Sequence, residues 1–379
     1  MDQNTARALF ELGACLVILD APLGIEFGID LDTWETGPLF NGLKMLPPGI
    51  HYVHYSALNG EKQPGMRCGF FYNFEAREVA VRRWCTESEE LIAVNATDSE
   101  RVRLGIRDLD KGLGAYQLDS YSRWQQLTSY ITPELLQRVL PPQGCFTSAT
   151  GSAYEDEEMA TVRRQLRQRA ERGELDANVQ AIIDSEPTQS NDRFQFTHVN
   201  IRHSFPVDAA PDQIHRYSQD KTWLLRTLLD QWPNGVIDLL GEFQLSFIVI
   251  LAGQNFTGIE HWKRLLHLVL GSAEALTDEQ LVGQLFVPLL SVLMIQLREC
   301  PREFIASVLE QDNFVAEILQ MLVLNVYECE GNAAQVLVPE LDKLRRLLAT
   351  FGWTLPDGRQ LQEAADVEEG EYAPQIVDI

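Results

Sequence analysis

Residues 24–56 constrain the fold of this chain more than any other segment. Two short β-prone stretches, 25–31 and 50–55, flank a middle part that is rich in turn residues. The turn residues are Gly37-Pro38, Asn41-Gly42 and Pro47-Pro48-Gly49. Such residues set the backbone φ angle or remove an N–H donor where a chain must turn. The pattern predicts short strands joined by tight turns, and it does not resemble a catalytic loop.

Alternating and apolar stretches before residue 85 predict further strands. The expected strands are 14–19, 26–30, 50–56, 69–74 and 79–84. The last two predict a hairpin whose loop is 75–78. Phe70, Tyr72 and Phe74 fall on one face of their strand, because side chains alternate along a strand. We therefore expect a small antiparallel sandwich with aromatic side chains on its inner face.

Changes in composition predict four parts of the chain. Residues 1–144 form a β-rich domain with some helix that closes at Pro141-Pro142. A polar linker spans 145–192, with a helix over 156–172 that is acidic at its start and basic towards its end, as the helix dipole favours. An α-helical domain spans 193–355, and an acidic, flexible tail spans 356–379.

Helical periodicity dominates the chain after about residue 218. Apolar residues recur at helical spacing over 239–251, 262–270, 318–326 and 341–351. Thr277 and Gln280 match a capping box, Pro301 suits the first turn of a helix, and Gly352 suits a helix C-terminus. Short polar connections between these helices predict antiparallel neighbours in an α-superhelix or bundle. The fold class is thus α+β with two domains.

The composition limits the possible partners. The formal charge of −24 would repel a phosphate backbone, so we expect no direct binding to nucleic acid. The apolar stretch 14–19 is too short to span a bilayer and is a poor signal peptide. We therefore expect no membrane partner, and a soluble protein inside the cell. The six cysteines lie far apart without a C-x-x-C pair, which indicates free, mostly buried thiols.

No residue pattern predicts catalysis or a metal site. His51 and His54 point to opposite faces of one expected strand, and His261 and His267 do not share a helix face. Phosphate loops, nucleophile elbows and dinucleotide fingerprints are absent from the sequence. We expect no cofactor.

Three carboxylates leave one alternative open. Asp30 and Asp32 can share a strand face, and Asp20 can approach them, which would suit a metal-dependent hydrolase. The favoured interpretation is that these residues accept backbone hydrogen bonds at strand ends and turns.

Two segments are candidates for partner binding. In the first, Trp262, Lys263 and Arg264 place an aromatic and two basic side chains beside an apolar stripe. The periodicity favours a simpler interpretation, in which Trp262 lies in the core and the basic residues are solvated. The second candidate is the end of the tail, formed by Gln375, Ile376, Val377, Asp378 and Ile379. This β-prone end follows an acidic spacer and can add as a strand to the sheet edge of a partner. Its alternative is a frayed terminus without a role.

Several segments in both expected domains form a distinctive sequence pattern. In the N-terminal part they are Glu26-Phe27-Gly28-Ile29-Asp30, Trp34, Gly37-Pro38, Gly42-Leu43-Lys44-Met45, Pro47 to His51, His54-Tyr55-Ser56, 66–71 and Arg83-Trp84. In the C-terminal part they are Leu240-Gly241-Glu242-Phe243-Gln244, 260–266 and Gln311-Asp312-Asn313-Phe314. Together these segments resemble the Aar family of splicing factors. The resemblance covers both expected domains, and the linker and the tail fit less well.

This resemblance implies a fold and a function. The fold is an N-terminal β-rich domain followed by a helical domain similar to VHS domains. The function is that of a non-catalytic assembly chaperone of the U5 small nuclear ribonucleoprotein, acting in the cytoplasm and the nucleus. It would hold the RNase H-like and Jab/MPN-like domains of the large spliceosomal scaffold protein and block premature loading of the helicase. The resemblance also implies that the tail takes part in an intermolecular sheet and that phosphorylation releases the client.

Another class of protein remains possible on the helical architecture alone. A VHS-like peptide or trafficking adaptor would share this architecture. Binding to acidic sorting peptides or lipids, and not to splicing proteins, would favour the adaptor.

Overall fold

The chain forms two compact units, which we describe separately. The computed structural model describes residues 12–57, 63, 65–155, 164, 192–206, 208–301, 314–329 and 333–363. Unit 1 comprises the chain up to Thr197 together with Ile248–Ile259, and unit 2 comprises His198–Phe247 and the chain from Glu260 onward. Most of the predicted linker, including nearly all of its expected helix, lies outside the described residues. The boundaries of the four parts predicted from composition stay predictions.

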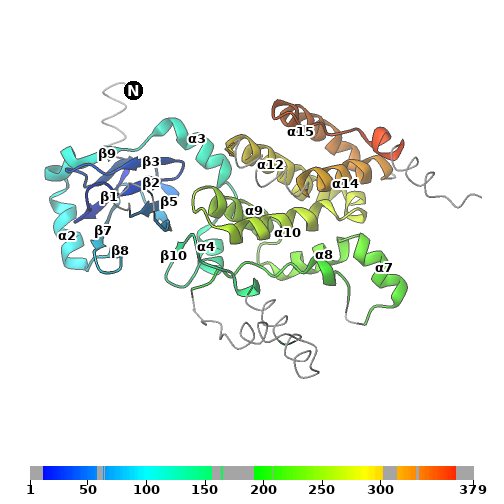
Figure 1. Ribbon diagram of the computed structural model, residues 1–379, viewed down its shortest axis with the longest axis horizontal. Coiled ribbons are helices and arrows are strands. Elements are labelled where there is room, and N and C mark those ends of the chain that lie inside the picture. Colours follow the sequence, from blue (N-terminus) through cyan, green and yellow to red (C-terminus); the bar gives the residue numbers. More distant parts are fainter. Residues whose placement is uncertain are drawn as a thin grey trace, which may run out of the picture. The chain divides into compact units, whose positions relative to one another are not determined.

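The first sheet of unit 1 has the strand order β8-β7-β1-β4-β9. Several strands of unit 1 are labelled in Figure 1, where this part of the chain is drawn in blue and cyan. Its strands are β1 (Ala14–Leu19), β4 (Gly42–Leu46), β7 (Val79–Cys85), β8 (Glu90–Ala93) and β9 (Leu113–Ala115). The pairs β1–β7 and β4–β9 are parallel, and the other two pairs are antiparallel. The sheet is therefore mixed, whereas the sequence predicted antiparallel pairing only.

The second sheet is antiparallel throughout and has the order β10-β6-β5-β2-β3. Its strands are β2 (Glu26–Ile29), β3 (Asp32–Glu35), β5 (Gly49–Ser56), β6 (Cys68–Phe74) and β10 (Cys145–Thr147). All five strands predicted from the sequence are present, with ends within one residue of those expected. The predicted β-rich N-terminal fold is confirmed.

The two sheets pack face to face around one apolar core. Phe27, Val53 and Phe70 from the second sheet meet Leu16 and Trp84 from the first. Phe70 and Phe74 are buried in this core and Tyr72 packs partly against it, so the predicted shared face is confirmed. The outer face of the first sheet is covered by a smaller apolar cluster that includes partly buried residues of α2 (Ala96–Leu104).

The predicted hairpin of 69–74 and 79–84 is wrong. β6 pairs with β5 and β10, whereas β7 pairs with β1 and β8, so the two strands belong to different sheets. The connection crosses from one layer of the sandwich to the other, with Arg77 in the left-handed region at φ 64°. Side-chain alternation alone cannot distinguish a hairpin from a connection between two packed sheets. In either case it indicates only that Phe74 and Ala80 face the core.

Two more helices complete unit 1. They are α3 (Leu118–Leu127) and α4 (Pro133–Val139). Thr132 caps α4 by accepting a hydrogen bond from the main-chain N–H of Leu135, and Pro133 occupies the first turn, where no N–H donor is needed. The indole of Trp124 donates to the carbonyl of Ile50 over 2.8 Å and thereby joins α3 to β5.

Unit 2 is built from helices, as the periodicity predicted. Its elements are α7 (Pro211–Gln219), α8 (Thr222–Gln231), most of α9 (Val236–Leu251) and of α10 (Phe256–Leu270), α11 (Glu279–Leu281), α12 (Val287–Glu299), α14 (Phe314–Glu328) and α15 (Val338–Thr350). The apolar stripes of α14 and α15 are buried. Gly352 follows α15 with φ 83°, a left-handed conformation that favours glycine at this position. The predicted helical C-terminal region is confirmed, and its likeness to VHS domains stays a prediction.

Two details of the sequence analysis need correction. The residue that caps the third helix is Asp278, whose carboxylate accepts from the N–H groups of Gln280 and Leu281, and not Thr277. An aspartate directly before the helix reaches these donors better than a threonine one residue further away. Among the cysteines, all six are free as predicted, but only Cys15 and Cys300 are buried.

Some helices of the described chain are long and apolar enough to cross a membrane. One is the continuous helical run Glu279–Glu299, and another is the pair α8–α9 if it is counted as one span despite its bend of 97°. Within the first run, 56% of the apolar window is buried inside the protein. Burial of this kind is what a core helix of a globular protein shows, so these helices are weak evidence for a membrane segment.

Candidate functional sites

Asp30 is the centre of a buried hydrogen-bond network in unit 1. It is 1% exposed, follows β2 directly and has φ 56°. Its carboxylate accepts from the main-chain N–H of Tyr52 at 2.9 Å, from the hydroxyl of Tyr116 at 2.6 Å and from Nδ1 of His51 at 2.6 Å. Nε2 of His51 lies 2.8 Å from the carbonyl of Pro47. Both ring nitrogens thus lie within hydrogen-bond distance of an acceptor oxygen.

The same network determines the role of the carboxylates. The two oxygens of Asp30 are used by three donors, and burial beside this carboxylate raises the pKa of Tyr116. Asp32 accepts instead from the hydroxyl of Ser120 at 2.5 Å, and Asp20 is 74% exposed beside Arg83. The three carboxylates therefore do not converge. Among the described residues, no group of three His, Cys, Asp or Glu side chains is placed to hold a metal ion.

His54 lies on the opposite face of β5 from His51, as the alternation predicted. Its ring lies over Gly28, where an added Cβ atom would approach Cε1 of His54 to 2.1 Å. The hydroxyl of Tyr52 lies over Gly69 in the same manner, at 2.2 Å from the position of a Cβ atom. Burial, and to a smaller extent the nearby Arg67 guanidinium, together lower the pKa of His54 to about 3. Packing against two aromatic rings explains why these strand positions hold glycine.

Arg67 and Asn255 fix the segment between α9 and α10 to the second sheet within unit 1. The Arg67 guanidinium pairs with Glu26 and also donates to the carbonyl of Ala252 over 3.1 Å. The side-chain amide of Asn255 donates to the carbonyls of Thr147 at 2.8 Å and Thr150 at 2.7 Å. Residues 248–259, which we call the corner segment, therefore complete unit 1 although they are distant in sequence.

A second buried network lies in unit 2. The carboxylate of Glu242 accepts from the indole of Trp232 at 3.0 Å and lies 2.9 Å from Nε2 of His261. Next to it, Trp262 stacks on Phe243 at a ring distance of 5.7 Å. Two of the C-terminal segments that carry the family resemblance, 240–244 and 260–266, thus contact each other inside the helical core.

The structure places the predicted patch on α10 in two environments. Trp262 is 3% exposed, and its indole donates to Oε1 of Gln296 over 2.8 Å, so it lies in the core as the periodicity favoured. Lys263 and Arg264 are partly exposed, and Nζ of Lys263 lies 5.7 Å from the ring centre of Phe314. Partner contact by this patch stays a prediction that now depends on the two basic residues.

The predicted tail strand, Gln375 to Ile379, lies outside the described residues. The chain that precedes it is anchored to unit 2. Nε of Arg345 donates to the carbonyl of Leu355 over 2.9 Å, and Gly358 packs against the ring of Tyr327, where a Cβ atom would meet it at 2.3 Å. Residues 358–363 form a last helical turn, so the tail begins at a fixed place.

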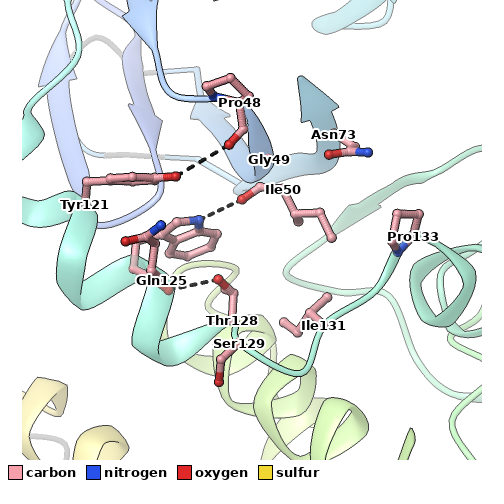
Figure 2. Close-up of a pocket in the computed structure, with 11 residues that line it drawn as sticks. Pro48, Gly49, Ile50, Asn73, Tyr121, Gln125, Thr128, Ser129, Ile131 and Pro133 are labelled. Carbon is pink, nitrogen blue, oxygen red and sulfur yellow. Dashed lines mark hydrogen bonds between the residues drawn. The ribbon is translucent and has the colours of Figure 1, made fainter. Parts of the chain in front are cut away.

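The sequence analysis did not find a groove between α3 and the start of β5, shown in Figure 2. Its volume is about 430 Å³. Ile50 and Ile131 lie between Gln125 on one side and Pro133 on the other, with Asn73 at one end and Ser129 at the other. The sequence indicates the groove only through the spacing of Tyr121 and Gln125, which places them on one face of α3. This spacing does not identify the strand against which α3 packs.

The fold and these sites define a two-unit α+β protein whose distinctive polar residues are largely buried in hydrogen-bond networks. Comparison with known families gives a more specific result. A family model described as the AAR2 N-terminal domain matches residues 12–141, and one described as the AAR2 C-terminal repeat region matches residues 196–356. The chain belongs to the AAR2 family.

Relatives from distant animals are similar to the chain over most of its length. The protein AAR2 homolog of Homo sapiens is 34% identical over 330 residues, which are 85% of each chain. The protein AAR2 homolog of Caenorhabditis elegans is 33% identical over 360 residues, which are 91% of this chain and 95% of that protein. The resemblance inferred from the sequence segments is therefore confirmed.

Proposed function

We propose that this chain is a non-catalytic assembly chaperone in pre-mRNA splicing. It binds the RNase H-like and Jab/MPN-like domains of the large spliceosomal scaffold protein during biogenesis of the U5 snRNP and the tri-snRNP, and it blocks premature loading of the helicase. The observation that carries this proposal is that both AAR2 family models match, in chain order, over the β-rich and the helical parts. Membership of this family supports a role related to splicing.

The described side chains support a binding role more than a chemical one. Asp30 and Glu242, the two most deeply buried carboxylates within the family segments, each serve several donors inside a core. A carboxylate with its oxygens engaged in this way is not available as a general base or a metal ligand. The conspicuous polar residues therefore stabilise the fold, and partner binding falls to exposed surfaces and to the tail.

The net charge of −24 fits a partner protein better than a nucleic acid. RNA in the assembled particle would be held by the scaffold protein and not by this chain. An assembly chaperone of this kind works in the cytoplasm and accompanies its client to the nucleus. No membrane is part of this proposal.

The tail is the segment that we propose to bind by strand addition. Gln375 to Ile379 would pair with an exposed sheet edge of the scaffold protein, where main-chain hydrogen bonds supply affinity and alternate side chains supply register. The spacer before it is acidic and carries Glu363, Asp366, Glu368, Glu369 and Glu371.

A binding assay with the two scaffold domains tests the proposal. Full-length protein is compared with a chain ending at Glu363, because Leu355 and Gly358 are packed in unit 2 and an earlier end would disturb it. We expect the shortened chain to bind more weakly. A full-length Ile376→Pro variant removes one main-chain donor and is expected to bind more weakly than an Asp378→Asn control. Equal binding by all forms would refute the tail hypothesis, and no binding by any form would refute the proposed function.

A further inference from the structure

The groove beside α3 has a lining that contrasts with the rest of the molecule. None of the described residues that line it carries a charge, although 23% of the chain is charged. Its central part is apolar, from Ile50, Ile131 and Pro133, and the exposed side-chain amides of Asn73 and Gln125 lie on its rim (Figure 2). A lining of this kind suits a neutral ligand that combines apolar groups with amide groups.

The groove is firmly built. Two side chains of α3 that line the groove contact main-chain carbonyl groups at the start of β5. The indole of Trp124 donates to the carbonyl of Ile50, and the hydroxyl of Tyr121 lies 3.4 Å from the carbonyl of Pro48. Trp124 is also 1% exposed, so it acts as a fixed base beneath the groove. A preformed site of this kind binds without a large cost of ordering its walls.

One common mode of peptide recognition does not fit this groove. Strand addition needs a free sheet edge, but β5 and β6 are interior strands with neighbours on both sides. The volume of about 430 Å³ suits a short segment of a partner and not a whole domain.

We propose that this groove binds a short, uncharged, proline-containing segment of a partner protein in the polyproline II conformation. Such a segment has few N–H donors, an apolar outline and exposed carbonyl groups. It matches an uncharged groove lined by an aromatic ring, a prolyl ring and side-chain amides, which can donate to those carbonyls. The inference does not rest on the proposed function, because it concerns a different surface and needs no splicing protein for its test.

Fluorescence anisotropy of labelled peptides tests this proposal on the full-length protein. The probes are decaproline and a Pro-Leu-Pro repeat, and the comparison peptides are a Gly-Ser repeat and a Pro-Glu-Pro repeat of equal length. We expect saturable binding of the two uncharged proline probes only. The double variant Asn73→Ala, Gln125→Ala should weaken it about tenfold through loss of two hydrogen bonds, whereas Gln137→Ala, an exposed glutamine of α4 outside the groove, should leave it unchanged.

Three results would overturn the proposal. One is the absence of saturable binding of both proline probes by the wild-type protein. Another is equal binding by the wild-type protein and the double variant, with melting temperatures showing that both are folded. The last concerns the chain's own uncharged segment Tyr372 to Val377. If the chain ending at Glu363 binds the probes much more tightly than the full chain, and a peptide of this segment competes, the occupant is the chain's own tail and not a partner.

Discussion

Replacement of Asp30 by alanine is the most direct test of the network in unit 1. The substitution leaves three buried donors without their acceptor: Nδ1–H of His51, the main-chain N–H of Tyr52 and the hydroxyl of Tyr116. An unsatisfied buried donor costs about 1–3 kcal/mol, so three of them cost at least about 3 kcal/mol. A loss above about 5 kcal/mol is exceptional for a single substitution. We therefore expect the free energy of unfolding to fall by about 3–5 kcal/mol.

Thermal unfolding and hydrogen exchange measure this effect. A change of about 1 kcal/mol shifts the melting temperature of a unit of this size by about 2–4 °C, so the expected decrease is about 6–20 °C. Exchange should accelerate most in β2 and β5, which carry the network. Asp30→Asn serves as a second variant, because asparagine tolerates the left-handed backbone at this position and keeps one acceptor oxygen. It should lose less stability than the alanine variant.

The matched control is Asp32→Ala, which removes one hydrogen bond from Ser120 at a partly exposed position. We expect a loss of about 1 kcal/mol or less. If Asp30→Ala costs no more than Asp32→Ala, Asp30 is not the organising residue that its contacts indicate. Stoichiometric bound metal that disappears in both variants would instead support the hydrolase alternative.

Three further predictions concern single positions in the two cores. Gly28→Ala should destabilise unit 1 by about 1–3 kcal/mol in urea unfolding, because the added Cβ atom would lie 2.1 Å from the His54 ring. The control Gly37→Ala should be nearly neutral, because no other atom lies within 4 Å of the added Cβ atom. Glu242→Ala should cost at least about 2 kcal/mol and accelerate exchange in α10, since it leaves the buried indole of Trp232 and Nε2 of His261 without their carboxylate partner. The pKa of His54 is lower in the native chain than in the unfolded chain, so the unfolded chain binds a proton that the native chain excludes. The free energy of unfolding should therefore fall as the pH drops from about 6.5 towards 3, by up to about 1.4 kcal/mol per pH unit. This slope should decrease in His54→Gln, and an unchanged slope would show that other groups cause the acid sensitivity.

Local patterns predicted much of the secondary structure. The strands that hold Phe70 and Phe74 follow from alternation, and the buried stripe of α14 follows from helical spacing. The strands β3, β4, β8, β9 and β10 were missed, because three to five residues carry little of either period. The sheet to which β7 belongs was also missed, because side-chain alternation records which face is buried and not which strand lies next to it.

The buried hydrogen-bond networks could not be predicted from local sequence patterns, because their members lie far apart in the chain. Asp30 and Tyr116 are separated by 86 residues, and nothing near Tyr116 indicates that its hydroxyl will be buried against a carboxylate. The groove has the same origin, since α3 and the start of β5 become neighbours only in the folded chain. The family segments contained Asp30, His51, Glu242 and His261. Resemblance thus marked positions whose physical role only the folded structure explains.

The corner segment 248–259 limits how this protein can be divided. The family model for the C-terminal region includes it, yet its contacts with Arg67 and Thr147 belong to unit 1. A cut in the linker would therefore yield an N-terminal fragment that lacks the segment bound by Arg67 and Thr147, and a C-terminal fragment that carries this segment without its partners. Neither fragment would contain a complete unit, because unit 1 is not continuous in sequence. Loss of either half of the chain would therefore damage both units.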